Sequence, residues 1–231
     1  MKAWPVLGIA FIEFIFLLAH WFLYSAWVAF CGTPSQPVDL ALRAALLVLA
    51  CSFVFAAMFS FYSASLLVTA IYRLAAVWLG FLNFLFCGAC LAWLTWWAMV
   101  LSGIDPSVAR HRPLVAWFFL DVAIAVGTYG LLNARHVRIR RVAIRLSNLP
   151  QSWRGRRALL ISDLHLGHVN QASFCKRVVA KAGRLNPDII FFPGDVFDGA
   201  KTDPDRLSAP FQQLSPPLGM YFSTGNHDEF G

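Results

Sequence analysis

Asp163 and His165 stand two residues apart, directly after a short apolar run at 158–162. Alternate residues of a strand point to the same side, so both side chains can reach one point just past its end. A carboxylate oxygen and an imidazole nitrogen are ligands that a divalent metal ion accepts. Because the pair alone is a weak signal, its value depends on the segments that follow.

Two later apolar runs, at 188–192 and 219–223, also end in a glycine followed by polar side chains. These side chains are Asp195 after the first run and Asn226, His227 and Asp228 after the second. A glycine lets the chain turn tightly after each strand. The same acidic residues are also common turn formers and helix caps, which is the structural alternative to metal binding.

Helical patterns between the three runs predict a parallel sheet. Apolar residues recur at helical spacing over 170–185, with Asn170 as the expected N-cap, and a second helix is expected from Thr202 or Asp203 with Pro204 in its first turn. The order β-α-β-α-β favours parallel strands with helices on the sheet faces. Ligands bind such sheets at the carboxyl ends of the strands, so we expect the three polar turns to meet there. Hard oxygen and imidazole ligands in one place are typical of a dimetal phosphoester site.

In order and spacing, the three polar blocks resemble the first three motifs of the calcineurin-like metallophosphoesterases. The blocks are Ser162-Asp163-Leu164-His165, Gly194-Asp195-Val196-Phe197-Asp198 and Gly225-Asn226-His227-Asp228. The resemblance covers about 159–229, and the apolar region ahead of it is similar to that of the family's membrane-anchored members. It implies a four-layer α/β sandwich and two divalent metal ions, for which manganese, iron and zinc all remain open.

The resemblance also implies a role for each polar residue. It implies metal binding for Asp163, His165, Asp195 and Asn226, with Asp195 bridging both ions, and catalysis for His227 and Asp228. His227, paired with Asp228, would lie near the scissile phosphate, and Asp198 would support the ligands. His168, beyond the metal turn, is expected at the surface or in a substrate pocket.

The chain departs from the family pattern after the third block. The family carries further metal-binding histidines downstream, including a Gly-His-x-His block, whereas this chain has no histidine after His227. We therefore expect the chain to be an incomplete fragment that is inactive by itself, while its full-length parent is the enzyme.

The region before Asn133 has the composition of a membrane domain. The whole chain is 58% hydrophobic and 13% charged, which is typical of membrane proteins. Four apolar runs, each near the ~20 residues needed to cross a bilayer, lie at 6–30, 40–68, 74–101 and 114–132, with Arg73 and a polar loop at 102–113 as the later boundaries. We expect a transmembrane helical domain at 1–134 and the N-terminal part of a metallophosphoesterase domain at 135–231.

Basic residues follow the fourth run. Residues 133–231 hold 14 of the 19 lysines and arginines, and alternation over 136–146 predicts an edge strand there. Since no nucleic-acid-binding motif accompanies this charge, we expect contact with membrane lipid rather than with nucleic acid. Four spans and the positive-inside rule predict that the catalytic part of this multi-pass protein faces the cytoplasm.

Together these features favour a membrane-anchored enzyme that hydrolyses a phosphoester or pyrophosphate with a hydroxide activated by two metal ions. A lipid-linked phosphate is one candidate substrate, because the enzyme is anchored in the membrane. The alternative is a membrane transporter or sensor bundle with a non-catalytic attachment. It is supported by Glu13, His20 and Asp121, which are ionisable residues inside spans. Buried polar contacts that fix helix register would explain the same three residues.

Overall fold

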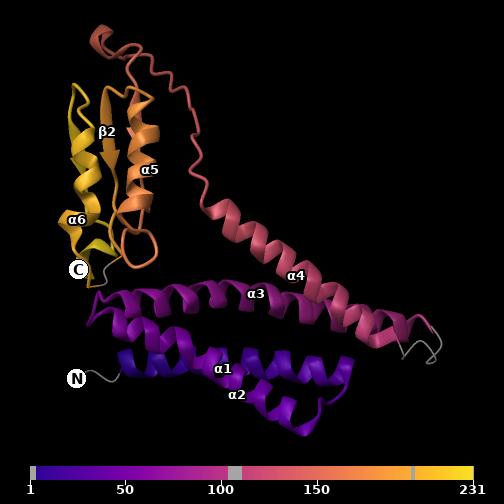
Figure 1. The fold of residues 1–231 in the computed structure, drawn as a ribbon. Helices are drawn as coiled ribbons and strands as arrows, with labels where there is room; N and C mark the ends of the chain where they lie inside the picture. The colour runs from indigo at the N-terminus through magenta and orange to yellow at the C-terminus, as the bar shows by residue number, and fades with distance from the viewer. Residues whose placement is uncertain (1–3, 104–110, 199–200, 231) are drawn as a thin grey trace. The chain divides into compact units, whose positions relative to one another are not determined.

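The computed structural model describes residues 4–103, 111–198 and 201–230 (Figure 1). The chain forms two compact units. The helical unit comprises Met1–Met58 and Ile71–Arg135, and the sheet unit comprises Phe59–Ala70 and His136–Gly231. The sheet unit is therefore discontinuous in sequence.

Four long apolar helices confirm the four expected runs. They are α1 (Trp4–Cys31), α2 (Gln36–Ser60), α3 (Leu66–Leu101) and α4 (Arg112–Ala134). All four are long and apolar enough to cross a membrane. Asp105-Pro106, expected in the loop between the last two spans, lies outside the described residues.

The expected boundary at Arg73 is wrong, because Arg73 lies inside α3. The chain turns instead between Ser60 and Leu66. There the hydroxyl of Ser65 accepts a hydrogen bond from the backbone N–H of Val68 at 3.3 Å, which satisfies one of the unpaired N–H groups at the start of a helix. A serine cap therefore sets this boundary, while the long side chain of arginine is tolerated within the helix.

Glycines bring α3 and α4 close together. A Cβ atom at Gly127 would lie 2.8 Å from the ring of Phe81, and one at Gly88 would lie 3.0 Å from the carbonyl oxygen of Phe119. Small residues allow this close backbone approach between membrane helices. Phe30 of α1 and Trp96 of α3 are buried in one apolar cluster, which joins these two helices.

The three ionisable residues of the spans have different surroundings. His20 is 3% exposed, and its Nδ1 lies 2.7 Å from the carbonyl oxygen of Phe16, while its Nε2 accepts a hydrogen bond from Trp78 at 2.9 Å. Both carboxylate oxygens of Glu13 are buried, whereas Asp121 is exposed on α4. His20 thus links α1 to α3. This contact favours the interpretation that His20 fixes the register of the two helices.

The sheet is parallel, as expected. Its strands are β1 (Ala158–Leu160), β2 (Ile189–Phe192) and β3 (Met220–Phe222), in the order β1-β2-β3. Helix α5 (Ala172–Gly183) contacts both α6 (Pro204–Ser208) and the 3-10 helix η3 (Ala209–Gln213) (Figure 1). Their apolar side chains pack with Leu166 and Ile190, which are fully buried, in one core. Two further 3-10 turns are η2 (Gln151–Trp153) and η4 (Asp228–Phe230).

In the sheet unit, the N-cap predicted for α6 is confirmed, whereas the N-cap predicted for α5 is wrong. Asp203 caps α6, because its carboxylate accepts a hydrogen bond from the N–H of Arg206 at 3.0 Å. Asn170 does not cap α5, whose N-cap position is Gln171. The amide of Asn170 instead donates to the carbonyl oxygen of Leu164 at 3.0 Å, so it supports the loop that carries the candidate metal ligands.

The predicted edge strand at 136–146 is wrong, since these residues form no strand. A strand needs hydrogen bonds to a neighbour, and alternating side chains supply none by themselves. Val142 and Ile144 are 71% and 76% exposed, and only Val137 in this segment packs against the core. The carbonyl oxygen of Val137 also accepts a hydrogen bond from Lys181 at 2.5 Å.

Asp188 joins the beginnings of β1 and β2. Its carboxylate accepts hydrogen bonds from the backbone N–H of Arg157 at 2.8 Å and from the guanidinium of Arg156 at 2.6 Å. The Arg157 N–H, and after it the Arg156 side chain, lower the pKa of this carboxyl group below its ordinary value. A carboxylate whose folded-state pKa is depressed stabilises the fold above its ordinary pKa, and this contribution disappears as pH falls through the folded-state pKa.

Asp188→Asn is therefore expected to destabilise the sheet unit at pH 7 and to have little effect in acid below both pKa values. Urea-dependent proteolysis of the purified chain in detergent, with pepsin as the protease in acid, measures this difference. Asp205→Asn, another acidic residue in the sheet unit, is the matched control. An equal loss of stability from Asp188→Asn at both pH values would contradict the assigned role of the charge.

Candidate metal centre

Three turns that follow the three strands meet at one edge of the sheet. The N–H of His165 donates to the carbonyl oxygen of Asp195 at 3.0 Å, and the N–H of Leu166 donates to Val196 at 2.8 Å. These bonds extend the pairing of β1 and β2 beyond the strands. The N–H of His227 donates to the carboxylate of Asp195 at 3.0 Å, which joins the third turn to the second.

Two groups of ligand atoms result. Asp163, His165 and Asp195 each offer an atom within 4.8 Å of the others. His165, Asp198 and His227 form a second group with the same limit. Asn226 is exposed in the turn after β3, next to His227. Carboxylate oxygens and imidazole nitrogens fit manganese, iron and zinc alike, so the donor set suits the implied cofactors without choosing among them.

The ligand pair after β1 forms differently from the way that strand alternation predicts. Strand β1 ends at Leu160, and the φ angles of Asp163 and His165 are 56° and 44°. Asp195 has a φ of 52°. This left-handed region is uncommon for residues other than glycine, although Asp, Asn and His enter it most readily, and such strained residues cluster at functional sites. Left-handed turns, rather than an extended chain, bring these side chains together.

Asp198 lies between two imidazole rings. Its Oδ1 is 3.5 Å from Nδ1 of His165 and 4.0 Å from Nδ1 of His227, and the two rings meet edge to face with centroids 4.6 Å apart. Burial raises the pKa of the Asp198 carboxyl group, and the neighbouring histidines oppose that shift. A Cβ atom at Gly167 would lie 2.8 Å from the Cβ of Asp198, so only glycine leaves room for this carboxylate.

Asp228 holds the backbone of two turns rather than the ring of His227. Its Oδ2 accepts hydrogen bonds from the N–H groups of Asp195 at 2.7 Å and Gly225 at 2.8 Å, and its Oδ1 accepts from Phe197 at 2.8 Å. The expected pairing of His227 with Asp228 is therefore replaced by proximity of the His227 ring to Asp198. Three backbone N–H groups occupy the Asp228 oxygens, which leaves them unavailable to the His227 ring. Residues that are adjacent in sequence need not have side chains that face each other.

Two glycines allow the second and third turns to touch. Gly194 has a φ of 112°, and a Cβ atom there would lie 2.8 Å from the backbone of Gly225. A Cβ atom at Gly225 would lie 2.6 Å from the backbone nitrogen of Asp195. Both contacts are closer than real Cβ atoms approach, so the two turns require glycine at each position.

His168 is buried at 2% exposure, so the expectation of a surface or pocket position is wrong. Its Nε2 lies 3.3 Å from the carbonyl oxygen of Ser60, and its Nδ1 lies 2.9 Å from the hydroxyl of Thr69. A carbonyl can only accept, so Nε2 carries a proton and donates to Ser60, while Nδ1 and the hydroxyl of Thr69 share the second hydrogen bond. Sequence reasoning missed this role because the partners are about a hundred residues away, in the other segment of the sheet unit.

Comparison with known proteins identifies the sheet segment. Residues 156–231 match the calcineurin-like phosphoesterase family. The matched residues include all three polar blocks and all three strands, so the resemblance inferred from the motifs is confirmed. No solved structure gives a significant match.

Two curated relatives each match about half of this chain. A "Transmembrane protein with metallophosphoesterase domain" of Danio rerio is 37% identical over 112 residues, which are 48% of this chain and 26% of the relative. The "UDP-2,3-diacylglucosamine pyrophosphatase LpxG" of Chlamydia trachomatis is 38% identical over 111 residues, which are 46% of this chain and 34% of the relative. The matches thus span about a quarter to a third of the length of these two relatives.

Asp228→Asn is expected to loosen the turns after β2 and β3 although Asp228 contributes no atom to either ligand group. The substituted amide has one acceptor oxygen in place of two, so at least one backbone N–H loses its partner. Hydrogen exchange of the backbone amides of Asp195, Phe197 and Gly225 is expected to accelerate, and Mn²⁺ affinity to fall by about 10- to 100-fold.

Exchange mass spectrometry and Mn²⁺ titration of the purified chain measure the two effects. Glu229→Gln, at the exposed neighbouring residue, is the matched control. Unchanged exchange at 195–197 in Asp228→Asn would refute the role assigned to the Asp228 carboxylate.

Proposed function

We propose that the full-length protein is a membrane-anchored, metal-dependent hydrolase of phosphoesters or pyrophosphates. The main support is the meeting of Asp163, His165 and Asp195 within 4.8 Å, in a segment that matches the calcineurin-like phosphoesterases. When bound, two divalent ions supply positive charge for the phosphoryl oxygens and lower the pKa of water.

The protein's own residues take distinct parts in this proposal. Asp163 and His165 would hold the first ion, Asp195 would contribute to the binding of both ions, and Asn226 would hold the second. His227 donates a hydrogen bond or a proton toward the leaving-group oxygen. The carboxylate of Asp198, 4.0 Å from Nδ1 of His227, orients that ring and leaves Nε2 as the nitrogen that faces substrate.

A lipid-linked phosphate or pyrophosphate is the substrate class that we propose. The name of the chlamydial relative describes a pyrophosphatase of a diacylated sugar nucleotide, and the helical unit of this chain keeps the enzyme at the membrane, where such substrates gather. The transporter or sensor alternative is less well supported, since the ring of His20 is engaged by Phe16 and Trp78.

Asp195→Ala is expected to abolish turnover in the full-length protein, whereas Asp198→Ala is expected to reduce it by roughly 10- to 100-fold. Loss of the bridging carboxylate removes a ligand from both ions, while loss of Asp198 removes only the group that orients the His227 ring. Metal content and manganese-dependent hydrolysis of a nitrophenyl phosphoester measure the difference, with Asp205→Asn as a control. Equal losses from the two alanine variants would remove the bridging assignment.

We also propose that residues 1–231 do not turn over substrate by themselves. In the assignment above they give the second ion only Asp195 and Asn226, and both ions are needed to hold the attacking and leaving oxygens. The same assay of the purified chain is expected to give no turnover above its Asp195→Ala variant. Robust turnover that depends on Asp195 would show that these donors suffice.

The sheet unit is proposed to face the cytoplasm. Arginines directly follow α4 at positions 135, 138, 140 and 141, and such clusters favour the cytoplasmic side. Two spans separate residues 59–70 from 136–231, so both segments emerge on one side of the membrane, which agrees with their membership of one compact unit. Arg112, at the other end of α4, argues for the opposite orientation with fewer charges, while Lys2 and Arg110, which also bear on orientation, lie outside the described residues.

Reporter fusions after Arg145 test the orientation. A cytoplasmic reporter is expected to be active there, and a reporter that works only outside the cytoplasm is expected to be silent. The opposite pattern would mean an inverted bundle or an odd number of spans. A fusion at Gly32, in the turn after α1, serves as the control with the reverse expectation.

A further inference from the structure

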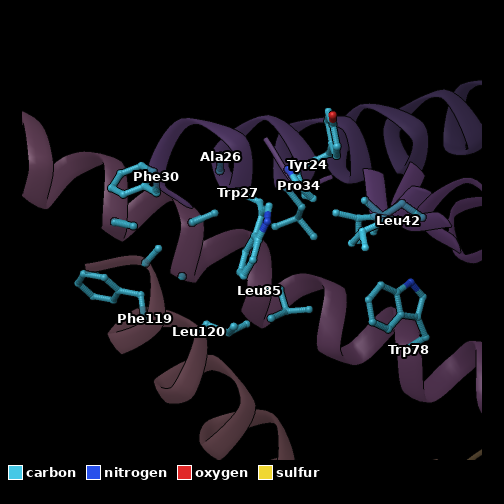
Figure 2. A pocket seen from close by; sticks show the side chains of 17 residues that line it. Tyr24, Ala26, Trp27, Phe30, Pro34, Leu42, Trp78, Leu85, Phe119 and Leu120 are labelled. Atoms are coloured by element: carbon cyan, nitrogen blue, oxygen red, sulfur yellow. The ribbon is translucent and has the colours of Figure 1, made fainter. Parts of the chain in front are cut away.

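The helical unit has a half-open cavity of about 460 Å³, lined by residues of all four helices. Figure 2 shows the ring of Trp27 in the middle of the lining side chains, with Phe30 and Phe119 toward one end and Trp78 toward the other. The size falls within the range of ligand pockets, ≈ 300–1,000 Å³. Neither the proposed hydrolysis nor any residue of the metal centre uses this space.

Small side chains create the cavity. Alanine or glycine occupies five lining positions on three different helices, which are Ala26, Gly88, Ala89, Ala92 and Ala116. Helix packing in membranes usually uses small residues for close backbone contact, as Gly88 does against α4. Here their combination with large aromatic residues leaves open volume, which dense protein interiors normally avoid.

The occupant of this space must be apolar. The other lining positions are mainly aliphatic or aromatic side chains, so a water molecule would lack the two to four polar partners that it needs. An α-helix, about 10–12 Å across with its side chains, is too wide for this volume. A hydrocarbon chain fits the space, and the bilayer around spanning helices supplies it.

A pair of opposite charges contacts Tyr24, one of the lining residues. Tyr24 lines the cavity, and its hydroxyl donates to the carboxylate of Asp39 at 2.6 Å. Arg43 donates to the Tyr24 oxygen at 3.0 Å and pairs with Asp39 at 2.8 Å. Asp39 lies in the first turn of α2, and the Arg43 side chain is 59% exposed, so it can reach the membrane interface.

We propose that this cavity binds one acyl chain of a phospholipid whose headgroup contains both a phosphate and an ammonium group. The hydrocarbon chain fills the apolar space, the phosphate binds Arg43, and the ammonium binds Asp39. An anionic headgroup without an ammonium would bring a phosphate that competes with Asp39 for the single guanidinium of Arg43, and would leave Asp39 without a cation in its place. The site is therefore a selective site for a zwitterionic lipid, separate from the metal centre and independent of the proposed hydrolysis.

Native mass spectrometry of the purified chain, with phosphatidylethanolamine or phosphatidylglycerol added, tests both parts of the proposal. One phosphatidylethanolamine is expected to bind at least fivefold more tightly than phosphatidylglycerol, and Arg43→Gln is expected to abolish that preference. Ala89→Leu, which fills the cavity, is expected to reduce lipid occupancy at least tenfold. Ala45→Leu, at an exposed position on α2 outside the cavity lining, is expected to leave occupancy unchanged.

A second measurement uses the unmodified protein, so that it does not depend on how well a variant folds. Phosphatidylethanolamine with a photoreactive diazirine in one acyl chain is expected to label lining residues such as Trp27, Leu85 and Leu120. Equal labelling of the outward-facing Leu47 and Leu94, which are 57% and 65% exposed, would overturn the proposal. So would Ala89→Leu binding as much lipid as Ala45→Leu, or equal affinity for the two lipids.

Discussion

The carboxylate of Asp228 joins the two backbone turns that carry Asp195 and His227 of the candidate metal centre. It accepts three backbone hydrogen bonds, two from the turn after β2 and one from the turn after β3. Hydrogen bonds to a charged acceptor are stronger than those between neutral groups. Without a shared acceptor, the two turns would be joined mainly by the single bond from His227 to Asp195. The positions of Asp195 and His227 therefore depend on a side chain that belongs to neither ligand group.

Local backbone strain is concentrated in a few residues of the candidate metal centre. Asp163, His165 and Asp195 all adopt left-handed backbone conformations, which cost of order 1–3 kcal/mol each. Asp198 is an acid whose charge is disfavoured by burial. A cation placed among these groups would relieve the repulsion between carboxylates, which is a physical reason for strain to persist at this edge of the sheet. Packing of the surrounding core, in which Leu166 and Ile190 are fully buried, holds the backbone in these conformations.

Regular features of the fold could be predicted from the sequence. Apolar length predicted the four helices, and alternating apolar runs and helical patterns predicted the parallel sheet with its three polar turns. Features that depend on distant partners could not be predicted. The alternation at 136–146 gave no sign that a pairing strand was lacking, and the burial of His168 depends on Ser60 and Thr69. Asp228 was recognised as part of the site, but its partners are backbone N–H groups, which every residue type presents equally.

The contribution of residues 59–70 to the sheet unit has a consequence for biosynthesis. The bonds from His168 to Thr69 and Ser60 join residues 99 and 108 positions apart, and contacts of such long sequence separation form late because loop closure must come first. A ribosome makes the turn between α2 and α3 well before β1, at roughly 5–20 residues per second. That turn must therefore wait until the chain has crossed the bilayer twice more, as α3 and α4. Membrane insertion thus precedes completion of the sheet unit, and errors in inserting α3 or α4 would deprive the buried His168 of its partners.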